Sequence, residues 1–247
     1  MNLIAANWKM NKTVKEALKF FNDLNSKTDE FADNEVLICP SFLALSEISK
    51  IKHEKIKLGA QNFYFEDSGA YTGETSLLIL KGFCEYVLVG HSERRSIFKE
   101  PNQLVNKKVL AALNHHFKPI LCIGETGDER QKNKTNEVLS QQLKACLKGV
   151  SENQIKNLVV AYEPVWAIGT GKNATSAMAQ EVHEFIREVL TDMYSQTTAR
   201  QLKLLYGGSV KPDNAKDLIA QEDINGFLIG GASLEVESFV EIINAAK

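Results

Sequence analysis

The sequence predicts an α/β protein in which residues 1–247 form one (β/α)8 barrel domain. Short apolar runs alternate with stretches of helical periodicity from one end of the chain to the other. Their spacing averages about 32 residues, which is the length of one strand–helix unit. No linker rich in proline, glycine or serine interrupts the alternation. Eight such units in about 250 residues are typical of this barrel.

Eight short apolar runs rich in β-forming residues are predicted strands. In chain order they are Leu3–Asn7, Val36–Cys39, Lys57–Gln61, Tyr86–Gly90, Pro119–Ile123, Leu158–Glu163, Leu204–Gly207 and Gly226–Ile229.

The segments between them carry apolar residues three or four positions apart, as helices with one buried face do. Such positions are Val14, Leu18 and Phe21; Val105, Val109 and Leu113; Val138, Leu139, Leu143 and Leu147; and Val182, Phe185, Ile186 and Val189. The predicted N-caps are Thr13, Ser41, Thr135 and Ser176.

An open doubly wound sheet is the competing architecture. It usually places phosphate-binding glycines directly after its first strand, where this chain has Trp8 and Lys9. The segment Gly169–Ala174 matches G-x-G-x-x-A, but it lies too far from its strand and lacks the acidic residue that should follow. It is no P-loop either, since Trp166 and Asn173 occupy two of the required positions.

Composition excludes several functional classes. With 29 basic and 31 acidic residues the net charge is −2, which gives no electrostatic case for nucleic acid or a membrane surface. The four cysteines are far apart and form no CxxC pair, as expected for reduced thiols in a cytoplasmic protein without a metal site. No apolar stretch is long enough for a signal peptide or a membrane span.

A carboxylate follows the sixth predicted strand. Glu163 ends an apolar run and precedes Pro164, which cannot continue a ladder. The segment Pro164–Ile168 is too apolar for a solvated loop, and Gly169-Thr170-Gly171 follows it with flexible backbone. This pattern predicts a lid that covers a ligand and excludes water, with Glu163 beneath it.

Other strand ends also carry reactive groups, and in a barrel these ends meet on one face. His91 follows the fourth strand, where a helical turn beginning at Ser92 would keep its imidazole neutral. Lys9 supplies a cation after the first strand. Cys122, inside the fifth strand, is expected to be a packed and unreactive thiol.

Glycine pairs follow the last two strands, at Gly207-Gly208-Ser209 and at Gly230-Gly231. Their backbone N–H groups can approach an anion closely, and this is the usual phosphate position of a (β/α)8 barrel. A carboxylate base, a neutral histidine, a lysine and a phosphate cradle suit proton transfer beside the carbonyl of a small phosphorylated substrate. This chemistry requires no cofactor.

The chain resembles the triosephosphate isomerase family, whose fold is the (β/α)8 or TIM barrel. The resemblance runs from residue 3 to about residue 240. It rests on ANWKMN (6–11), GHSERR (90–95), CIGE (122–125), AYEPVWAIGTGK (161–172), YGGSV (206–210) and GFLIGGASL (226–234). The family interconverts dihydroxyacetone phosphate and glyceraldehyde 3-phosphate without a cofactor.

The resemblance implies a role for each matching residue. Glu163 would be the base, His91 the group that polarises the carbonyl, and Lys9 the cation that holds the substrate's negative charge. Pairing a glutamate base with a neutral histidine is the family's established mechanism and comes here from the resemblance. Asn7, Lys9, Gly169, Ser209, Gly230 and Gly231 would bind substrate, and Glu93 and Cys122 would support the site from behind. Lys99, Gly127 and Ser176 depart from the family's usual residues.

A homodimer is the expected assembly. The connection Asn62–Ser76 is long and aromatic, so it needs a covering surface. In the family this loop inserts beside the neighbouring subunit's active site, with Thr72 near its tip. A purely local packing role is the alternative.

Two other functions remain open from the sequence. One is a class I aldolase-like barrel in which Lys9 forms a Schiff base. The other is a phosphosugar-binding barrel without catalysis.

Overall fold

Eight parallel strands close into a barrel in the computed structural model, which describes residues 1–167 and 174–246. Each strand pairs with the next in sequence, and β1 pairs with both β2 and β8. The strands are β1 (Leu3–Asn7), β2 (Glu35–Cys39), β3 (Ile56–Ala60), β4 (Tyr86–Val89), β5 (Lys118–Ile123), β6 (Val159–Tyr162), β7 (Leu204–Tyr206) and β8 (Gly226–Ile229). The predicted (β/α)8 barrel is therefore confirmed.

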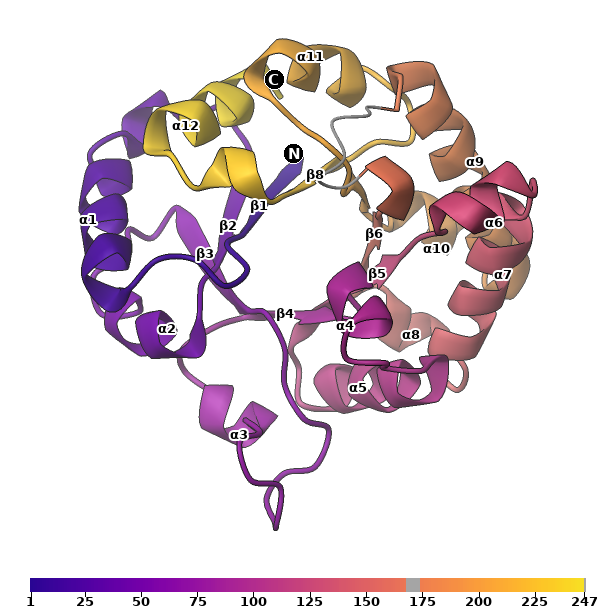
Figure 1. Cartoon of the computed structure of the whole chain (residues 1–247), viewed down its shortest axis with the longest axis horizontal. Helices are drawn as coiled ribbons and strands as arrows, with labels where there is room; N and C mark the ends of the chain where they lie inside the picture. Colours follow the sequence, from indigo (N-terminus) through magenta and orange to yellow (C-terminus); the bar gives the residue numbers. More distant parts are fainter. Residues whose placement is uncertain (168–173, 247) are drawn as a thin grey trace.

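Helices surround the strands as an outer ring (Figure 1). They are α1 (Val14–Asn25), α2 (Phe42–Ile48), α3 (Leu77–Leu80), α4 (Ser92–Ser96), α5 (Asn102–Asn114), α6 (Gly127–Gln131), α7 (Thr135–Cys146), α8 (Glu152–Ile155), α9 (Ser176–Met193), α10 (Gln196–Gln201), α11 (Pro212–Ile219) and α12 (Val236–Ala245). Three short 3-10 helices complete the set: η1 (Thr28–Glu30), η2 (Val165–Ala167) and η3 (Gly231–Ser233).

The apolar core has two layers, because successive strand residues point to opposite faces. One cluster contains only strand residues, such as Leu3, Ala5 and Leu205, and fills the barrel interior. The other contains the alternate strand residues together with helix residues, and it lies between barrel and helices. Tyr162 and Tyr206 belong to this outer layer. Because the faces alternate, Glu163 after Tyr162 and Gly207 after Tyr206 lie on the inner side, at the barrel mouth.

Two of the four predicted helix caps are wrong by one residue. Thr13 caps α1 in a capping box with Glu16, and Ser41 precedes α2. Thr135, however, is the first residue of α7, and Ser176 is the first residue of α9. The cap of α9 is Thr175, whose side chain accepts a hydrogen bond from Met178 N at 3.2 Å. Adjacent Thr and Ser are both good caps, so composition alone does not choose between them.

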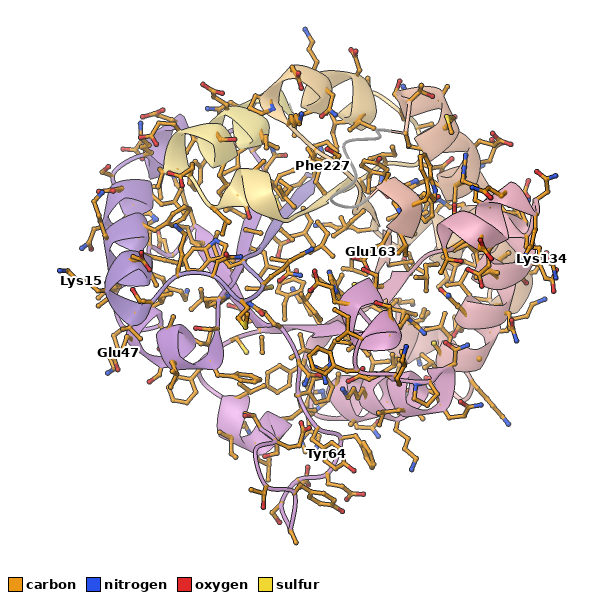
Figure 2. The ribbon with its side chains drawn as sticks, in the orientation of Figure 1. Lys15, Glu47, Tyr64, Lys134, Glu163 and Phe227 are labelled. Carbon is orange, nitrogen blue, oxygen red and sulfur yellow. The ribbon has the colours of Figure 1, made fainter. Side chains whose placement is uncertain are left out.

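The connection between β3 and α3 projects away from the ring of helices (Figure 1). Tyr64 bridges Ser76 at its base and packs against Phe65 and Tyr71, with ring centroids 4.5 Å apart in both pairs. Tyr64 lies in the projecting part in Figure 2. Thr72, near the tip, is exposed.

Within residues 1–167 and 174–246, none of the helices has both the length and the hydropathy that a bilayer span requires.

Candidate active site

A cavity of about 340 Å³ opens where the strands end. It is lined by Asn7, Lys9, His91, Glu163, Gly207, Gly208, Ser209, Val210, Lys211, Leu228, Ile229, Gly230, Gly231 and Ala232. The structure thus brings together the predicted residues from β1, β4, β6, β7 and β8. A cavity of this size suits a small ligand.

Glu163 follows β6 and is only 2% exposed. Its side chain lies near the middle of the ring of helices in Figure 2. Oε2 accepts a hydrogen bond from Ser92 N at 2.8 Å, and Oε1 lies 2.9 Å from His91 Nε2. Burial raises the pKa of Glu163, but His91, the Ser92 N–H and Lys9 outweigh burial and hold that pKa below its ordinary value. The buried carboxylate is therefore ionised at neutral pH.

His91 is the N-cap of α4. Its Nδ1 accepts a hydrogen bond from Glu93 N at 3.2 Å, which assigns the ring proton to Nε2, facing Glu163. Burial disfavours the imidazolium, but the Glu163 carboxylate outweighs burial and raises the pKa of His91. Glu163 raises the pKa of His91 only while its carboxylate lies beside the imidazole ring. Protonation would also set Nδ1–H against the N–H of Glu93, so the hydrogen bonds favour the neutral imidazole.

Lys9 is held in a strained conformation at the cavity wall. Its φ of 53° lies in the left-handed region, which costs free energy for a residue other than glycine. The Asn7 side chain accepts from Lys9 N at 3.0 Å, and Gln61 donates to Lys9 O at 2.9 Å. These bonds fix the backbone, and Lys9 Nζ pairs with Glu93 Oε1 at 2.7 Å. The strain thus serves to place an ammonium group at the cavity.

The glycine pairs follow β7 and β8 and line the cavity. A Cβ at Gly207 would lie 3.0 Å from Glu163 Cγ, a tight contact, whereas a Cβ at Gly230 would lie at an ordinary 3.5 Å from Lys9 Cε. Gly207 therefore lets the backbone approach Glu163 closely. Ser209 also lines the cavity, and Gly231 begins η3.

The beginning of the predicted lid forms η2, directly after Pro164. Trp166 Nε1 donates to Glu125 Oε1 at 2.9 Å, and the Arg130 guanidinium lies 4.5 Å from the Trp166 ring centroid. The same Glu125 oxygen also accepts from Tyr162 and Arg130, each at 3.1 Å. Ile168–Thr170, including the predicted phosphate ligand Gly169, lies outside the described residues.

The two residues expected to support the site do not line this cavity. Glu93 pairs with Lys9 through its carboxylate. Cys122 is fully buried in the barrel interior, and burial raises the pKa of its thiol well above its ordinary value. Thr72 lies in the projecting loop and not at this chain's own cavity.

Sequence reasoning missed three contributors. Ser92 was expected only to open a helical turn, yet it binds Glu163 through its N–H. Gln61 fixes the carbonyls of Lys9 and Cys39 from the end of β3. Lys211 adds a second cation to the cavity lining. All three follow strand ends, and that position was the signal available in the sequence.

The departures from the family pattern have local consequences. Lys99 adopts φ 59°, a left-handed conformation that glycine adopts without strain, and its Nζ donates to Ser96 O at 2.6 Å. A Cβ at Gly127 would lie 3.6 Å from Trp166 Cβ, so glycine removes one ordinary contact there. Ser176 begins α9 beneath the Thr175 cap.

Among residues 1–167 and 174–246, no group of three or more His, Cys, Asp or Glu side chains could hold a metal ion.

Comparison with known proteins agrees with this geometry. The family model described as triosephosphate isomerase matches residues 2–246. A triosephosphate isomerase of Finegoldia magna is 50% identical over 249 residues, covering 99% of this chain and 98% of that relative. One of Caldanaerobacter subterraneus subsp. tengcongensis is 50% identical over 244 residues, covering 98% of each chain. The chain therefore belongs to the triosephosphate isomerase family.

Proposed function

We infer that this chain interconverts dihydroxyacetone phosphate and D-glyceraldehyde 3-phosphate. The observation that carries the inference is the contact between a buried, ionised Glu163 and the Nε2 of His91 inside a cavity lined by glycine pairs. The family and its two relatives support the same reaction. The enzyme would act as an isomerase in glycolysis and gluconeogenesis, as a single domain in the cytoplasm.

In this proposal Glu163 removes a proton from the carbon beside the carbonyl. The negative charge that develops on the carbonyl oxygen is met by the N–H of His91 and by the ammonium of Lys9. His91 then moves a proton between the two oxygens of the enediolate. Glu163 returns its proton to the neighbouring carbon, and the carbonyl re-forms on the carbon that lost the proton. No atom is gained or lost, so the step needs no co-reactant.

The substrate's phosphate would lie against Ser209, Gly230 and Gly231, with Gly169 as a further ligand. Backbone N–H groups favour an anion there because glycine leaves them accessible. Asn7 supports Lys9 through the contact with its backbone nitrogen. For catalysis the carboxylate must leave Ser92 N and reach the substrate carbon. The hydrogen bonds of Glu163 described above must therefore rearrange before the proton is transferred.

A homodimer is part of the same proposal. Exposed apolar side chains follow the first and fourth strands, at Met10, Ile97 and Phe98, and others lie on α3, at Leu78 and Ile79. A second cavity, of about 310 Å³, lies among Met10, Phe42, Asn62, Arg94 and Phe98. The projecting loop Asn62–Ser76 of one subunit would fill this cavity on the other.

The alternatives gain no support. The ammonium of Lys9 is paired with Glu93 at 2.7 Å, whereas a Schiff-base lysine must react as a free amine. Borohydride trapping with substrate would detect such an adduct, and we expect none.

The proposed function is tested by a coupled isomerase assay together with proton exchange in deuterated water. The parent should isomerise the sugar and incorporate deuterium at the carbon beside the carbonyl. Glu163→Gln should bind glycerol 3-phosphate yet lose both activities. Binding without exchange in the parent would instead identify a phosphosugar-binding barrel.

A further inference from the structure

His183 is a buried histidine that the proposed reaction does not use. It lies on α9, is 0% exposed, and belongs to the layer between the barrel and the helices. Its ring stands edge-on to Tyr162, with centroids 5.7 Å apart and an angle of 85°. The Tyr206 ring is tilted by 45° to the same imidazole, with centroids 6.2 Å apart. Since Tyr162 and Tyr206 are paired on adjacent strands, one imidazole contacts the ends of β6 and β7 together.

Each tyrosine is followed in the chain by a residue that lines the active-site cavity. Tyr162 precedes Glu163, and its hydroxyl donates to Glu125, which also accepts from Trp166. Tyr206 precedes Gly207, whose N–H donates to Tyr162 O at 2.7 Å. A Cβ at Gly208 would collide with the Tyr206 hydroxyl, so that phenol packs against the backbone leading to Ser209.

A buried imidazole costs more free energy in this space than an apolar side chain would. Nδ1 lies 2.7 Å from Ala179 O, which fixes the ring on its helix. Nε2 makes no hydrogen bond of good geometry among the described residues. The Leu205 backbone is close enough to raise the pKa of the ring, but burial outweighs it. A buried polar atom without a partner costs free energy that a leucine would not. Packing alone therefore does not explain a histidine here.

We propose that His183 is a positioning residue that fixes the rings of Tyr162 and Tyr206, and so holds Glu163 in register with the phosphate-binding backbone after β7. The Nδ1 contact with Ala179 sets the ring's orientation, and the edge-on contact transmits it to Tyr162. Burial lowers the pKa of His183 to about 4. The ring is therefore neutral at working pH and contributes through its shape.

The inference rests on the proposed function, and His183→Leu tests it. This change removes both ring nitrogens and keeps an apolar side chain of moderate size. We expect an unfolding temperature equal to or above that of the parent, because the unpartnered Nε2 is gone. We also expect kcat/KM to fall about tenfold, since small misplacement of reacting groups is costly. A residue that only stabilised the fold would lose stability and activity together.

Ile186→Val is the matched control, because Ile186 is also fully buried on α9 and has no ring contact with the tyrosines. It should lower stability while kcat and KM stay within twofold of the parent, in keeping with the cost of about one lost methyl group. If His183→Leu does not fold, His183→Phe takes its place, since it keeps a ring but not the nitrogen bound to Ala179. A loss of about threefold is then expected. Parental kinetics in either folded variant would overturn the proposal.

A readout independent of turnover separates the two proposals. Glycerol 3-phosphate binding is followed by tryptophan fluorescence, which reports Trp166 beside Glu125. His183→Leu should weaken this binding severalfold and change the emission of the empty protein. A parent without isomerase activity would refute the proposed function, whereas unchanged binding and emission in His183→Leu would refute the positioning role alone.

Discussion

At the scale of single residues, the position of the Glu163 carboxylate decides the chemistry. It is held by Ser92 N and His91 Nε2 at 2.8 and 2.9 Å, in a site where both partners are buried. The carboxylate can thus exchange one well-placed set of hydrogen bonds for another when substrate arrives. The length of the side chain determines how far the carboxylate extends toward the substrate. Replacement by aspartate, which is one methylene shorter, tests this dependence.

Glu163→Asp should keep the fold and the affinity for glycerol 3-phosphate but lose most turnover. One methylene withdraws the carboxylate by about 1 Å, and such misplacement costs on the order of 10²-fold. Steady-state kinetics and fluorescence titration measure the two quantities separately. Turnover within threefold of the parent would show that Glu163 is not the base.

His91 should be neutral at neutral pH, with its proton on Nε2. Nitrogen NMR of the labelled protein reports the protonation of both ring nitrogens. In Glu163→Gln the pKa of His91 should fall, because the carboxylate that raises it is gone. His91→Gln should lower turnover sharply while leaving the fold intact. An imidazolium in the glycerol 3-phosphate complex at neutral pH would remove its assigned role.

The sequence predicted the reactive side chains that line the cavity better than the groups that hold them. Glu163, His91 and Lys9 are recognisable because each is a reactive side chain at the end of an apolar run. Ser92 donates to Glu163 through its hydroxyl at 3.3 Å and through its backbone N–H, which every residue type except proline possesses. Gln61 acts only because β1, β2 and β3 are adjacent in the closed barrel. Such contacts depend on three-dimensional neighbours that no local pattern encodes.

At the scale of elements, a buried charge network joins α4 to α5. Lys108 on α5 contacts Glu100 Oε1 and Asn62 Oδ1, each at 2.7 Å, and Arg94 on α4 also contacts Glu100. Burial raises the pKa of Glu100, but Lys108 and Arg94 outweigh it and hold that pKa below its ordinary value. Burial lowers the pKa of Lys108 despite its partner. Removing either charge would therefore leave the other buried and incompletely compensated.

Lys108→Met should lower the free energy of unfolding by about 3 kcal/mol, the lower end for breaking a buried pair, because Arg94 remains. Urea denaturation measures this loss. The control is Lys107→Met at an exposed neighbouring position, which should lower the free energy of unfolding by less than about 1 kcal/mol. The loss should be full above pH 4.5, the ordinary pKa of Glu100, and should shrink as pH falls through its lowered folded value. A pH-independent difference would contradict the ion-pair account.

Element boundaries were predicted as well as local patterns allow. The strands were found, but Gln61, Gly90, Glu163 and Gly207 lie just beyond them. Glu163 N and Gly207 N still donate to Ile123 O and Tyr162 O, each at 2.7 Å, so these two residues make the last contacts of their strands. Apolarity alone cannot mark the last paired residue of a strand. The misplaced caps have another cause, because at α9 Thr175 and Ser176 are both good caps, and at α7 the residue before the helix is Lys134.

At the scale of the whole molecule, the regular repeat of strand and helix predicted closure of the barrel. The same repeat does not explain the exposed apolar side chains that follow β1 and β4. Met10 is 98% exposed and Phe98 62%, and both line the second cavity together with Lys9 and Arg94. A second subunit would cover them and complete the cavity wall on that side.

The parent should therefore be a dimer at micromolar concentration, and Thr72→Arg should make it a folded monomer. Thr72 is exposed in this chain, so arginine costs nothing in the isolated subunit. Within an interface the same charge would lose its water without a partner. Light scattering measures the mass, and circular dichroism checks the fold. Turnover should fall at least about tenfold, because the partner's loop no longer supports Lys9 and Glu93. Thr197→Arg, on exposed α10, is the control and should stay dimeric. A fully active monomeric parent would show that the loop packs only on its own subunit.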